Sequence, residues 1–444
     1  MKNNLDMQLF LRIKRTISDF FSFQHHRALL GIVVLILIFF TSLNWVAWGN
    51  AKVGSKDSDR PIPPWSGEMV LGKSTVDQIP LTPRLPDVSM IGNRSSLVKL
   101  AALEKGYFSG ALVGPAVWVD HYDFKSAGDL KKVIQTAKNL GFKSIFFQVR
   151  EVADAYYQSR YEPWSKNLTG VLGKNPGWDP LEVALSESRR NHLKLYAWFN
   201  VYTVWRGETA PRLKTQLYLK HPDWLAYEKD RGKMKLNPGY TYLSPGNPQV
   251  TNYLKKVCLD LLSRYQVAGI LLDKVNYPDQ YYSYDSVSLG IFERQSKLGW
   301  DEWRISQINN FLIQLRQGIK NQRIKTQILA SVYGEYDEGK RTFGQDSIGW
   351  IKQGLVDLIC PLIEWDFEGY PRFDLQIEEF KARLSDDQKL CVGISAYKFA
   401  GDFTKLKKQV ETIKKYHLKN FSFYSFRQLQ QRLDGLKGLL NIFK

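Results

Sequence analysis

The sequence predicts an α/β fold, a (β/α)8 TIM barrel preceded by an N-terminal transmembrane anchor and a Pro-rich linker. Eight short apolar runs recur beyond residue 91, and they are apolar throughout, as strands covered by helices on both faces are. Segments with apolar residues three or four positions apart lie between them, for example DLKKVIQTAKNL and VTNYLKKVCLDLLSRY. Eight alternating units of this kind are typical of a (β/α)8 barrel.

The first 48 residues predict a membrane anchor. Residues 1–27 carry five basic side chains, Lys2, Arg12, Lys14, Arg15 and Arg27, which predict a cytoplasmic segment. Residues 28–48 are nearly uncharged, with LLGIVVLILIFF at their centre, and are long enough to span a bilayer. A cleaved signal peptide is the alternative, because the densest apolar core is short and small residues follow it. Either reading predicts that the rest of the chain is exported.

The remaining chain divides into a tether and one domain. Residues 49–90 are rich in Pro and polar residues without periodicity, which predicts a linker, and residues 91–444 form the barrel. Its strands are predicted at 116–120, 144–149, 195–200, 269–273, 327–332, 358–363, 390–395 and 420–424. The connections 201–247 and 274–299 are far longer than usual α/β loops. In a barrel both follow C-terminal strand ends, where we expect them to wall a groove.

The composition indicates a folded protein with an anionic partner. With 44% hydrophobic residues, including 24 Phe and 13 Trp, the chain can bury a sizeable core. Its formal net charge of +18 suits an acidic glycan, an anionic membrane surface or a nucleic acid. The basic residues are scattered, and no zinc-finger spacing or RNA-binding motif occurs. We therefore predict no nucleic-acid partner; the competing hypothesis would need a continuous basic stripe.

Missing motifs disfavour several chemistries. The three cysteines, Cys258, Cys360 and Cys391, each lie in an apolar stretch, which predicts buried free thiols; a bond between Cys360 and Cys391 is the alternative. The six histidines form neither an HExxH motif nor a dense cluster. GxSxG, P-loop and dinucleotide-binding GxGxxG motifs are also absent. The sequence thus predicts neither a metal nor a cofactor.

Carboxylates follow the predicted strands, at the edge where barrel enzymes hold their catalytic groups. The clearest is Asp273, which ends the strand in GILLDKVNYP (269–278). The others are Asp120, Glu151, Asp154, Glu335, Glu364 and Asp366. Glycoside hydrolysis uses such groups in pairs: one protonates the leaving oxygen while the other attacks the sugar or activates water. For each residue, a turn cap or a rim salt bridge is the structural alternative.

Aromatic side chains in the same segments favour a sugar substrate, because their apolar faces can stack on pyranose rings. The candidates are Trp164, Trp198, Tyr202, Trp205, Tyr277, Tyr281, Tyr282 and Trp365. Taken singly, each could equally pack in the core.

Eight stretches carry a resemblance to a known family. They are FFQVREVADAYYQS (146–159), EPWSKNLTG (162–170), PGWDPL (176–181), YAWFNVY (196–202), HPDW (221–224), LSPGNPQV (243–250), GILLDKVNYP (269–278) and GISAYKF (393–399). In this order, residues 116–426 resemble the family-10-like glycosyl hydrolase domain of bacterial envelope proteins, a group distinct from the family 10 xylanases. The resemblance implies a barrel fold and action on peptidoglycan, including glycan strands stripped of their peptides.

The chain departs from the usual pattern of that family at several positions. Ala153 replaces a Gly, Val201 a Pro, Ser244 an Asp and Lys274 a second acidic residue, while Leu362 and Glu364 replace a Gln and a Tyr.

We therefore predict an exported glycoside hydrolase, inner-membrane anchored or secreted, that acts on an envelope polysaccharide, with peptidoglycan as the expected substrate. Asp273 is the expected nucleophile or principal carboxylate, with Glu364 or Glu335 as acid/base. The expected sugar-binding residues are Arg150, Asp154, Asn200, Tyr202, Tyr277 and Trp164. The alternative is a non-catalytic glycan-binding scaffold with a degenerate site, which the departures at Ser244 and Leu362 favour.

Overall fold

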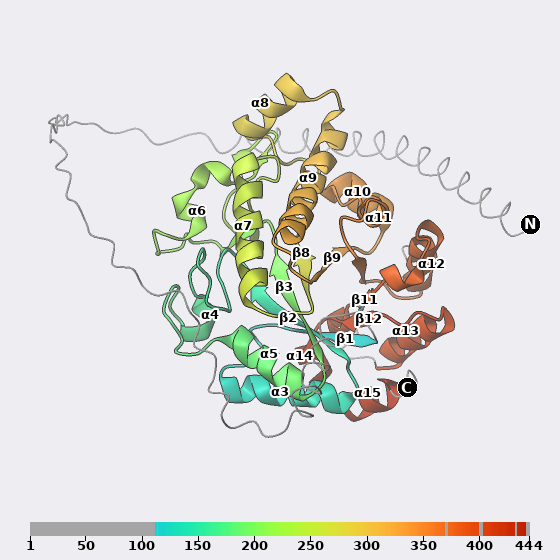
Figure 1. Cartoon of the computed structure of the whole chain (residues 1–444). Coiled ribbons are helices and arrows are strands. Elements are labelled where there is room, and N and C mark those ends of the chain that lie inside the picture. The colour runs from blue at the N-terminus through green and yellow to red at the C-terminus, as the bar shows by residue number, and fades with distance from the viewer. Residues whose placement is uncertain (1–111, 113, 369–371, 399–402, 431–432, 441–444) are drawn as a thin grey trace, which may run out of the picture. The chain divides into compact units, whose positions relative to one another are not determined.

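The computed structural model describes residues 112, 114–368, 372–398, 403–430 and 433–440 (Figure 1). The predicted cytoplasmic segment, membrane anchor and linker, residues 1–90, lie outside the described residues. Within the described ranges, no helix combines the length and the apolar character needed to cross a membrane.

Eight parallel strands close into a barrel, as predicted. They are β1 (Pro115–Val119), β2 (Ser144–Arg150), β3 (Lys194–Asn200), β8 (Gly269–Asp273), β9 (Gln327–Tyr333), β10 (Leu358–Ile363), β11 (Val392–Ile394) and β12 (Phe421–Phe423). Their order around the barrel is β1-β12-β11-β10-β9-β8-β3-β2. Each predicted strand is confirmed, and no end differs from the prediction by more than about two residues, the usual uncertainty of element boundaries.

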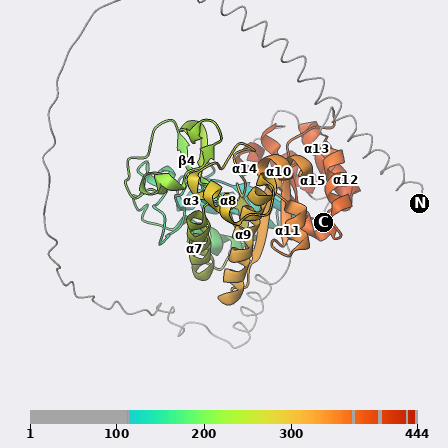
Figure 2. The same cartoon turned by 90° about the horizontal axis from the view of Figure 1, so that it is seen from above.

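Helices surround the strands, as Figures 1 and 2 show. The longer ones are α3 (Ala127–Leu140), α5 (Pro180–Arg190), α7 (Pro248–Arg264), α9 (Trp300–Asn321), α12 (Phe373–Arg383) and α13 (Phe403–Lys415). Shorter helices are α4 (Lys166–Thr169), α6 (Leu217–Lys220), α8 (Ser286–Gln295), α10 (Tyr336–Phe343), α11 (Ser347–Lys352), α14 (Phe426–Leu429) and α15 (Leu433–Leu440).

The helix ends follow local sequence signals. The Ser126 side chain caps α3 by accepting a hydrogen bond from the Asp129 N–H, and Gly141 ends that helix with a left-handed backbone at φ 104°. Asp179 caps α5, whose first residue is Pro180, the position where a missing N–H costs nothing. These signals fix where α3 begins and ends and where α5 begins.

The strands separate two apolar clusters. Side chains that point into the barrel form one cluster, which includes Trp118, Phe146, Trp198 and Leu271, and the helices cover the other side of the strands. Cys258, Cys360 and Cys391 are buried free thiols, as predicted.

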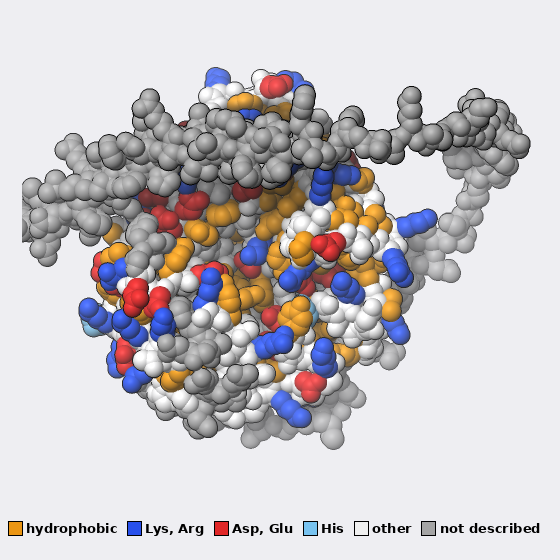
Figure 3. Space-filling model, turned by 180° about the vertical axis from the view of Figure 1, so that it is seen from behind, with side chains coloured by type: hydrophobic (Ala, Val, Ile, Leu, Met, Phe, Trp, Pro, Cys, Tyr) orange, Lys and Arg blue, Asp and Glu red, His pale blue; other side chains and the backbone are white. Residues whose placement is uncertain are grey.

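Both long connections begin at C-terminal strand ends. The first contains an antiparallel pair, β4 (Thr203–Gly207) and β7 (Asn237–Tyr242), and a small hairpin of β5 (Tyr227–Glu228) and β6 (Gly232–Lys233). The second contains α8. On the face shown in Figure 3, basic and acidic side chains are interspersed, without a continuous basic stripe.

Candidate active site

Asp273 lies at the C-terminal end of β8, opposite Asn200 of β3 in the sheet register. Its Oδ2 is 3.2 Å from the Trp198 Nε1–H, which also donates to Asn200 Oδ1 at 2.9 Å. Its Oδ1 accepts a hydrogen bond from the Lys274 backbone N–H at 2.9 Å. Two N–H donors thus fix a carboxylate that is only 6% exposed, at the bottom of the barrel mouth.

An aromatic floor supports this carboxylate. The Trp198 ring lies 4.9 Å from Trp118 and 5.8 Å from Tyr424, measured between ring centroids. Tyr424 follows β12, which is four positions from β8 around the ring of eight strands and therefore directly opposite Asp273. The pKa of Tyr424 is raised by burial and by the charges of Asp273, Asp120 and Glu151.

Glu151, directly after β2, is a second carboxylate at the C-terminal ends of the barrel strands. Its Oε1 accepts from the Tyr240 hydroxyl at 3.2 Å, and its Oε2 lies 3.3 Å from the Tyr156 hydroxyl. His121 Nδ1 is 3.7 Å from Oε2. Burial and the nearby Asp154 raise the pKa of Glu151, because both disfavour its charged form. A carboxyl group that keeps its proton at higher pH suits a general acid.

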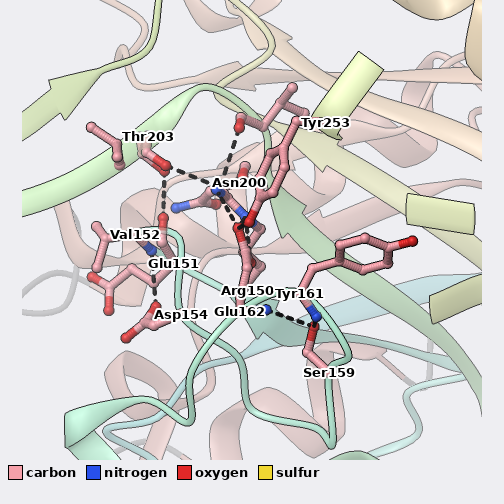
Figure 4. A network of polar contacts seen from close by, with 12 residues as sticks. Arg150, Glu151, Val152, Asp154, Ser159, Tyr161, Glu162, Asn200, Thr203 and Tyr253 are labelled. Atoms are coloured by element: carbon pink, nitrogen blue, oxygen red, sulfur yellow. Dashed lines mark hydrogen bonds and ion pairs between the residues drawn. The ribbon is translucent and has the colours of Figure 1, made fainter. Parts of the chain in front are cut away.

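A buried network around Arg150 holds these strand ends in place (Figure 4). The Arg150 guanidinium pairs with Glu162, with Nε donating at 3.0 and 2.9 Å. Its Nη1 donates to the carbonyls of Asn200, the last residue of β3, and of Val201 and Thr203, which follow it. The side chains of Arg150 and Glu162 are 0% and 1% exposed. Arg150 therefore fastens the exit of β3 to the loop after β2.

Burial corrects the predicted sugar contacts of three residues. Arg150, Tyr202 and Tyr277 have no exposed surface, so they cannot contact a substrate in this conformation. The Tyr277 hydroxyl donates to the Arg304 carbonyl at 3.0 Å, with the Arg304 guanidinium 4.3 Å above its ring. Tyr202 packs against Phe311 of α9. Tight packing gives all three a structural role.

The other predicted binding residues lie nearer the mouth. Asn200, only 1% exposed, shares the Trp198 N–H with Asp273. Asp154 is also 1% exposed and accepts from the Val152 N–H at 3.0 Å, so it affects the site through its charge on Glu151. Trp164 is partly buried, and its backbone forms an isolated parallel β-bridge with that of Ala155.

Glu364 and Glu335, the predicted acid/base candidates, follow β10 and β9. The Glu364 carboxylate is 40% exposed and lies 3.5 Å from Lys398 Nζ. Glu335 begins α10 as its N-cap residue. The charge of the neighbouring Asp273, and to a smaller extent those of Tyr242 and Glu364, raise the pKa of Lys274. Arg206 Nη1 lies 3.5 Å from Glu151 Oε1, so a nearby cation does not distinguish the two carboxylates. Burial does, since Glu151 is only 5% exposed, and burial favours the protonated form that a proton donor needs.

Ser244, one of the positions that depart from the family pattern, lies apart from these strand-end carboxylates. Its hydroxyl is buried, 2.6 Å from Ser283 Oγ and 2.6 Å from Asp285 Oδ2. Asp285 in turn caps α8 by accepting from the Ser288 N–H. Ser244 therefore belongs to a buried cluster that fixes the second long connection. Leu362 of β10 lines the barrel interior.

The Glu151 environment was not predictable from local sequence. The strand-end position marked Glu151 as one carboxylate among several. Its hydrogen-bond partner Tyr240 comes from β7, 89 residues away. In the described part of the chain, no group of three or more His, Cys, Asp or Glu side chains could hold a metal ion.

Comparisons with known proteins agree with this architecture. The model of the family described as Glycosyl hydrolase-like 10 matches residues 115–408, which confirms the resemblance found in the sequence. Glycosyl hydrolase YngK of Bacillus subtilis (strain 168) is 26% identical over 295 residues, which are 61% of this chain and 56% of that protein. Glycosyl hydrolase DigH of Escherichia coli (strain K12) is 27% identical over 293 residues, 59% of this chain and 64% of that protein. The chain thus spans less than two thirds of the length of these relatives.

A solved structure shares the fold. The PgaB (BpsB) glycoside hydrolase domain from Bordetella bronchiseptica superposes with a TM-score of 0.56 at 16% sequence identity, covering 74% of this chain and 99% of that one. At this identity the likeness concerns the fold alone.

Proposed function

This chain belongs to the glycosyl hydrolase-like 10 family, and on that premise we propose that it is a glycoside hydrolase acting on a cell-envelope polysaccharide, the glycan strands of peptidoglycan. The observation that carries the proposal is that Asp273 ends β8 and Glu151 follows β2, the two strands that flank β3, and that burial and Asp154 raise the pKa of Glu151. Two carboxyl groups in different environments are what glycoside hydrolysis requires.

In the proposed mechanism, Asp273 acts as the nucleophile or as the base that activates water. The Trp198 N–H orients it, and the Lys274 N–H holds its other oxygen. Glu151 protonates the leaving oxygen. Strands β2 and β8 both pair with β3, so the backbones from which the two side chains extend lie two strand spacings apart, about 10 Å. Glu364 and Glu335 remain the alternative proton donors.

Ser244 does not argue against hydrolysis, since its hydroxyl lies in the buried cluster with Asp285 rather than beside Asp273. The substitution therefore leaves the proposed carboxylate pair intact.

Digestion of purified peptidoglycan, with and without its stem peptides, followed by mass spectrometry of the fragments, tests the proposal. Wild-type protein should release defined saccharide fragments, and Asp273→Asn should release none. Comparing Glu151→Gln with Glu364→Gln and Glu335→Gln identifies the proton donor. Full turnover by Glu151→Gln together with loss in Glu364→Gln would reverse our assignment of the acid.

We also propose that residues 28–48 anchor the protein in the membrane and place the barrel outside the cytoplasm. The support is the apolar, nearly uncharged sequence of this segment after a basic N-terminus. Retention of the protein in the membrane fraction after an alkaline wash would support the anchor. Degradation of the protein by protease added to spheroplasts would support a barrel outside the cytoplasm. Release by the wash would favour cleavage of the segment.

A further inference from the structure

The exposed aromatic side chains gather on particular loops of the barrel. Among the described residues, the exposed Phe, Trp and Tyr side chains are all tyrosines: Tyr122, Tyr161, Tyr281, Tyr333 and Tyr397. Single exposed apolar residues are common and need no explanation. Three of these tyrosines, however, end or closely follow the barrel strands β1, β9 and β11 at the edge that carries Asp273.

Tyr122 and Tyr333 stand on opposite sides of the barrel mouth. Tyr122 closely follows β1 and Tyr333 ends β9, and these strands are four positions apart in the closed ring of eight strands. The strands that connect β1 to β9 on one side are β2, β3 and β8, which carry Glu151 and Asp273; those on the other side are β12, β11 and β10. A line from Tyr122 to Tyr333 therefore crosses the mouth between its two walls and passes the proposed catalytic pair.

Both tyrosines are held in place although the residues are 52% and 37% exposed. The Tyr122 N–H donates to Asp120 Oδ1 at 2.8 Å, and its ring lies 3.9 Å from that of His121. The Tyr333 N–H donates to Gln345 Oε1 at 2.8 Å, and its ring lies 5.7 Å from that of Trp365. A ring already fixed by neighbours loses little conformational freedom when a ligand binds.

We propose that Tyr122 and Tyr333 are sugar-stacking platforms at the two ends of a groove that takes an extended glycan strand. The inference rests on the proposed function and deepens it. An aromatic ring offers an apolar face to a pyranose and a hydroxyl at its edge. Sugars bind on both sides of the bond beside Asp273, so the enzyme cuts within a strand and prefers long strands to short ones.

Binding by the full-length Asp273→Asn protein tests the inference without cleavage of the probe. The probes are β-1,4-linked N-acetylglucosamine oligomers of two and six sugars, titrated by calorimetry. Tyr122→Ala and Tyr333→Ala should each weaken binding of the hexamer roughly two- to tenfold while leaving the dimer nearly unchanged. Tyr333→Phe should retain hexamer binding, because the ring remains.

Tyr161→Ala is the matched control. Tyr161 is 45% exposed but packs against Tyr253 of α7 in the outer helical layer, 6.3 Å between ring centroids. It should leave binding of both oligomers unchanged. The inference would be overturned if Tyr122→Ala and Tyr333→Ala lost no more hexamer affinity than Tyr161→Ala. It would also be overturned if they lost as much affinity for the dimer as for the hexamer. Unfolding temperatures close to wild type confirm that each variant folds.

Hydrolysis, measured separately with Asp273 intact, distinguishes this inference from the proposed function. Length-dependent binding that needs both tyrosines, without any cleavage, would refute the hydrolase and leave the platforms standing. Cleavage together with unaltered hexamer affinity in both alanine variants would refute the platforms alone.

Discussion

Replacing Asp273 by Asn separates chemistry from folding at the barrel mouth. The two side chains have nearly the same shape, and Asn can still accept the hydrogen bond from the Lys274 N–H through its oxygen. Its amide NH2 then faces the Trp198 Nε1–H, so one hydrogen bond of 3.2 Å is lost. The Trp198 N–H keeps its 2.9 Å bond to Asn200 Oδ1, so the net loss is that of one ordinary hydrogen bond, about 0.5–1.5 kcal/mol, and removing a buried charge offsets part of this. We expect the unfolding temperature to fall by less than about 5 °C.

Activity should respond far more strongly than stability. Without a carboxylate at this position, neither attack on the sugar nor activation of water can occur as proposed, and we expect kcat/KM to fall at least about 1000-fold, equivalent to about 4 kcal/mol of barrier. The assay is release of soluble saccharide from glycan strands freed of stem peptides. It is run beside a thermal melt of the same preparation.

Asp366→Asn provides a matched control for that experiment. Asp366 also follows a barrel strand, but its carboxylate pairs with Lys405 Nζ at 2.5 Å, away from the Asp273 ring. This variant should keep wild-type turnover. Retained turnover by Asp273→Asn, or equal losses in the two variants, would refute the assignment of Asp273.

Three further predictions test the surroundings of the site. Glu151→Gln should lower kcat about 100- to 10,000-fold. Wild-type activity should fall as pH rises through the raised pKa of Glu151, and the pH profile of Glu151→Gln should lack this fall. An unchanged pH profile would count against Glu151 as the acid. Glu162→Gln leaves the buried Arg150 charge without its partner, which should cost about 3–5 kcal/mol of stability and lower the unfolding temperature by roughly 10 °C. The control is Arg190→Gln, in an exposed ion pair, which should change the unfolding temperature by about 1 °C or less. Burial and a neighbouring carboxylate raise the pKa of Asp123 to about 7, so wild-type stability should fall as pH rises from about 4 through 7. Asp123→Asn should escape this loss of roughly 4 kcal/mol, so its melts should differ from wild type at pH 8 and not at pH 4.

The fold followed closely from the sequence. Each apolar run, such as GILLD at 269–273, is long enough for one strand and too short for a helix, and the segments between the runs repeat with helical period. Burial on both faces makes parallel strands apolar throughout, which leaves a strong local signal. The same signal placed Asp273 at a strand end, and the family motifs agreed with it.

The partner of Asp273 was much harder to predict. Glu364 and Glu335 follow strands in the same way as Glu151, so position along the chain does not distinguish the three. What distinguishes Glu151 is its burial beneath Tyr240 and beside Asp154, which raises its pKa, whereas Glu364 is exposed beside Lys398. Tyr202 and Tyr277 were predicted to bind sugar because aromatic residues in loops look alike in sequence, yet both are fully buried.

Sequence alone therefore determined the barrel, its eight strands, the family and one strand-end carboxylate, because each of these leaves a periodic or contiguous pattern in the chain. Only the tertiary structure decided which side chains share the mouth with Asp273. The closed ring brings β1 opposite β9 and β12 opposite β8, and the pKa of a carboxyl group depends on neighbours that such closure supplies from distant parts of the chain.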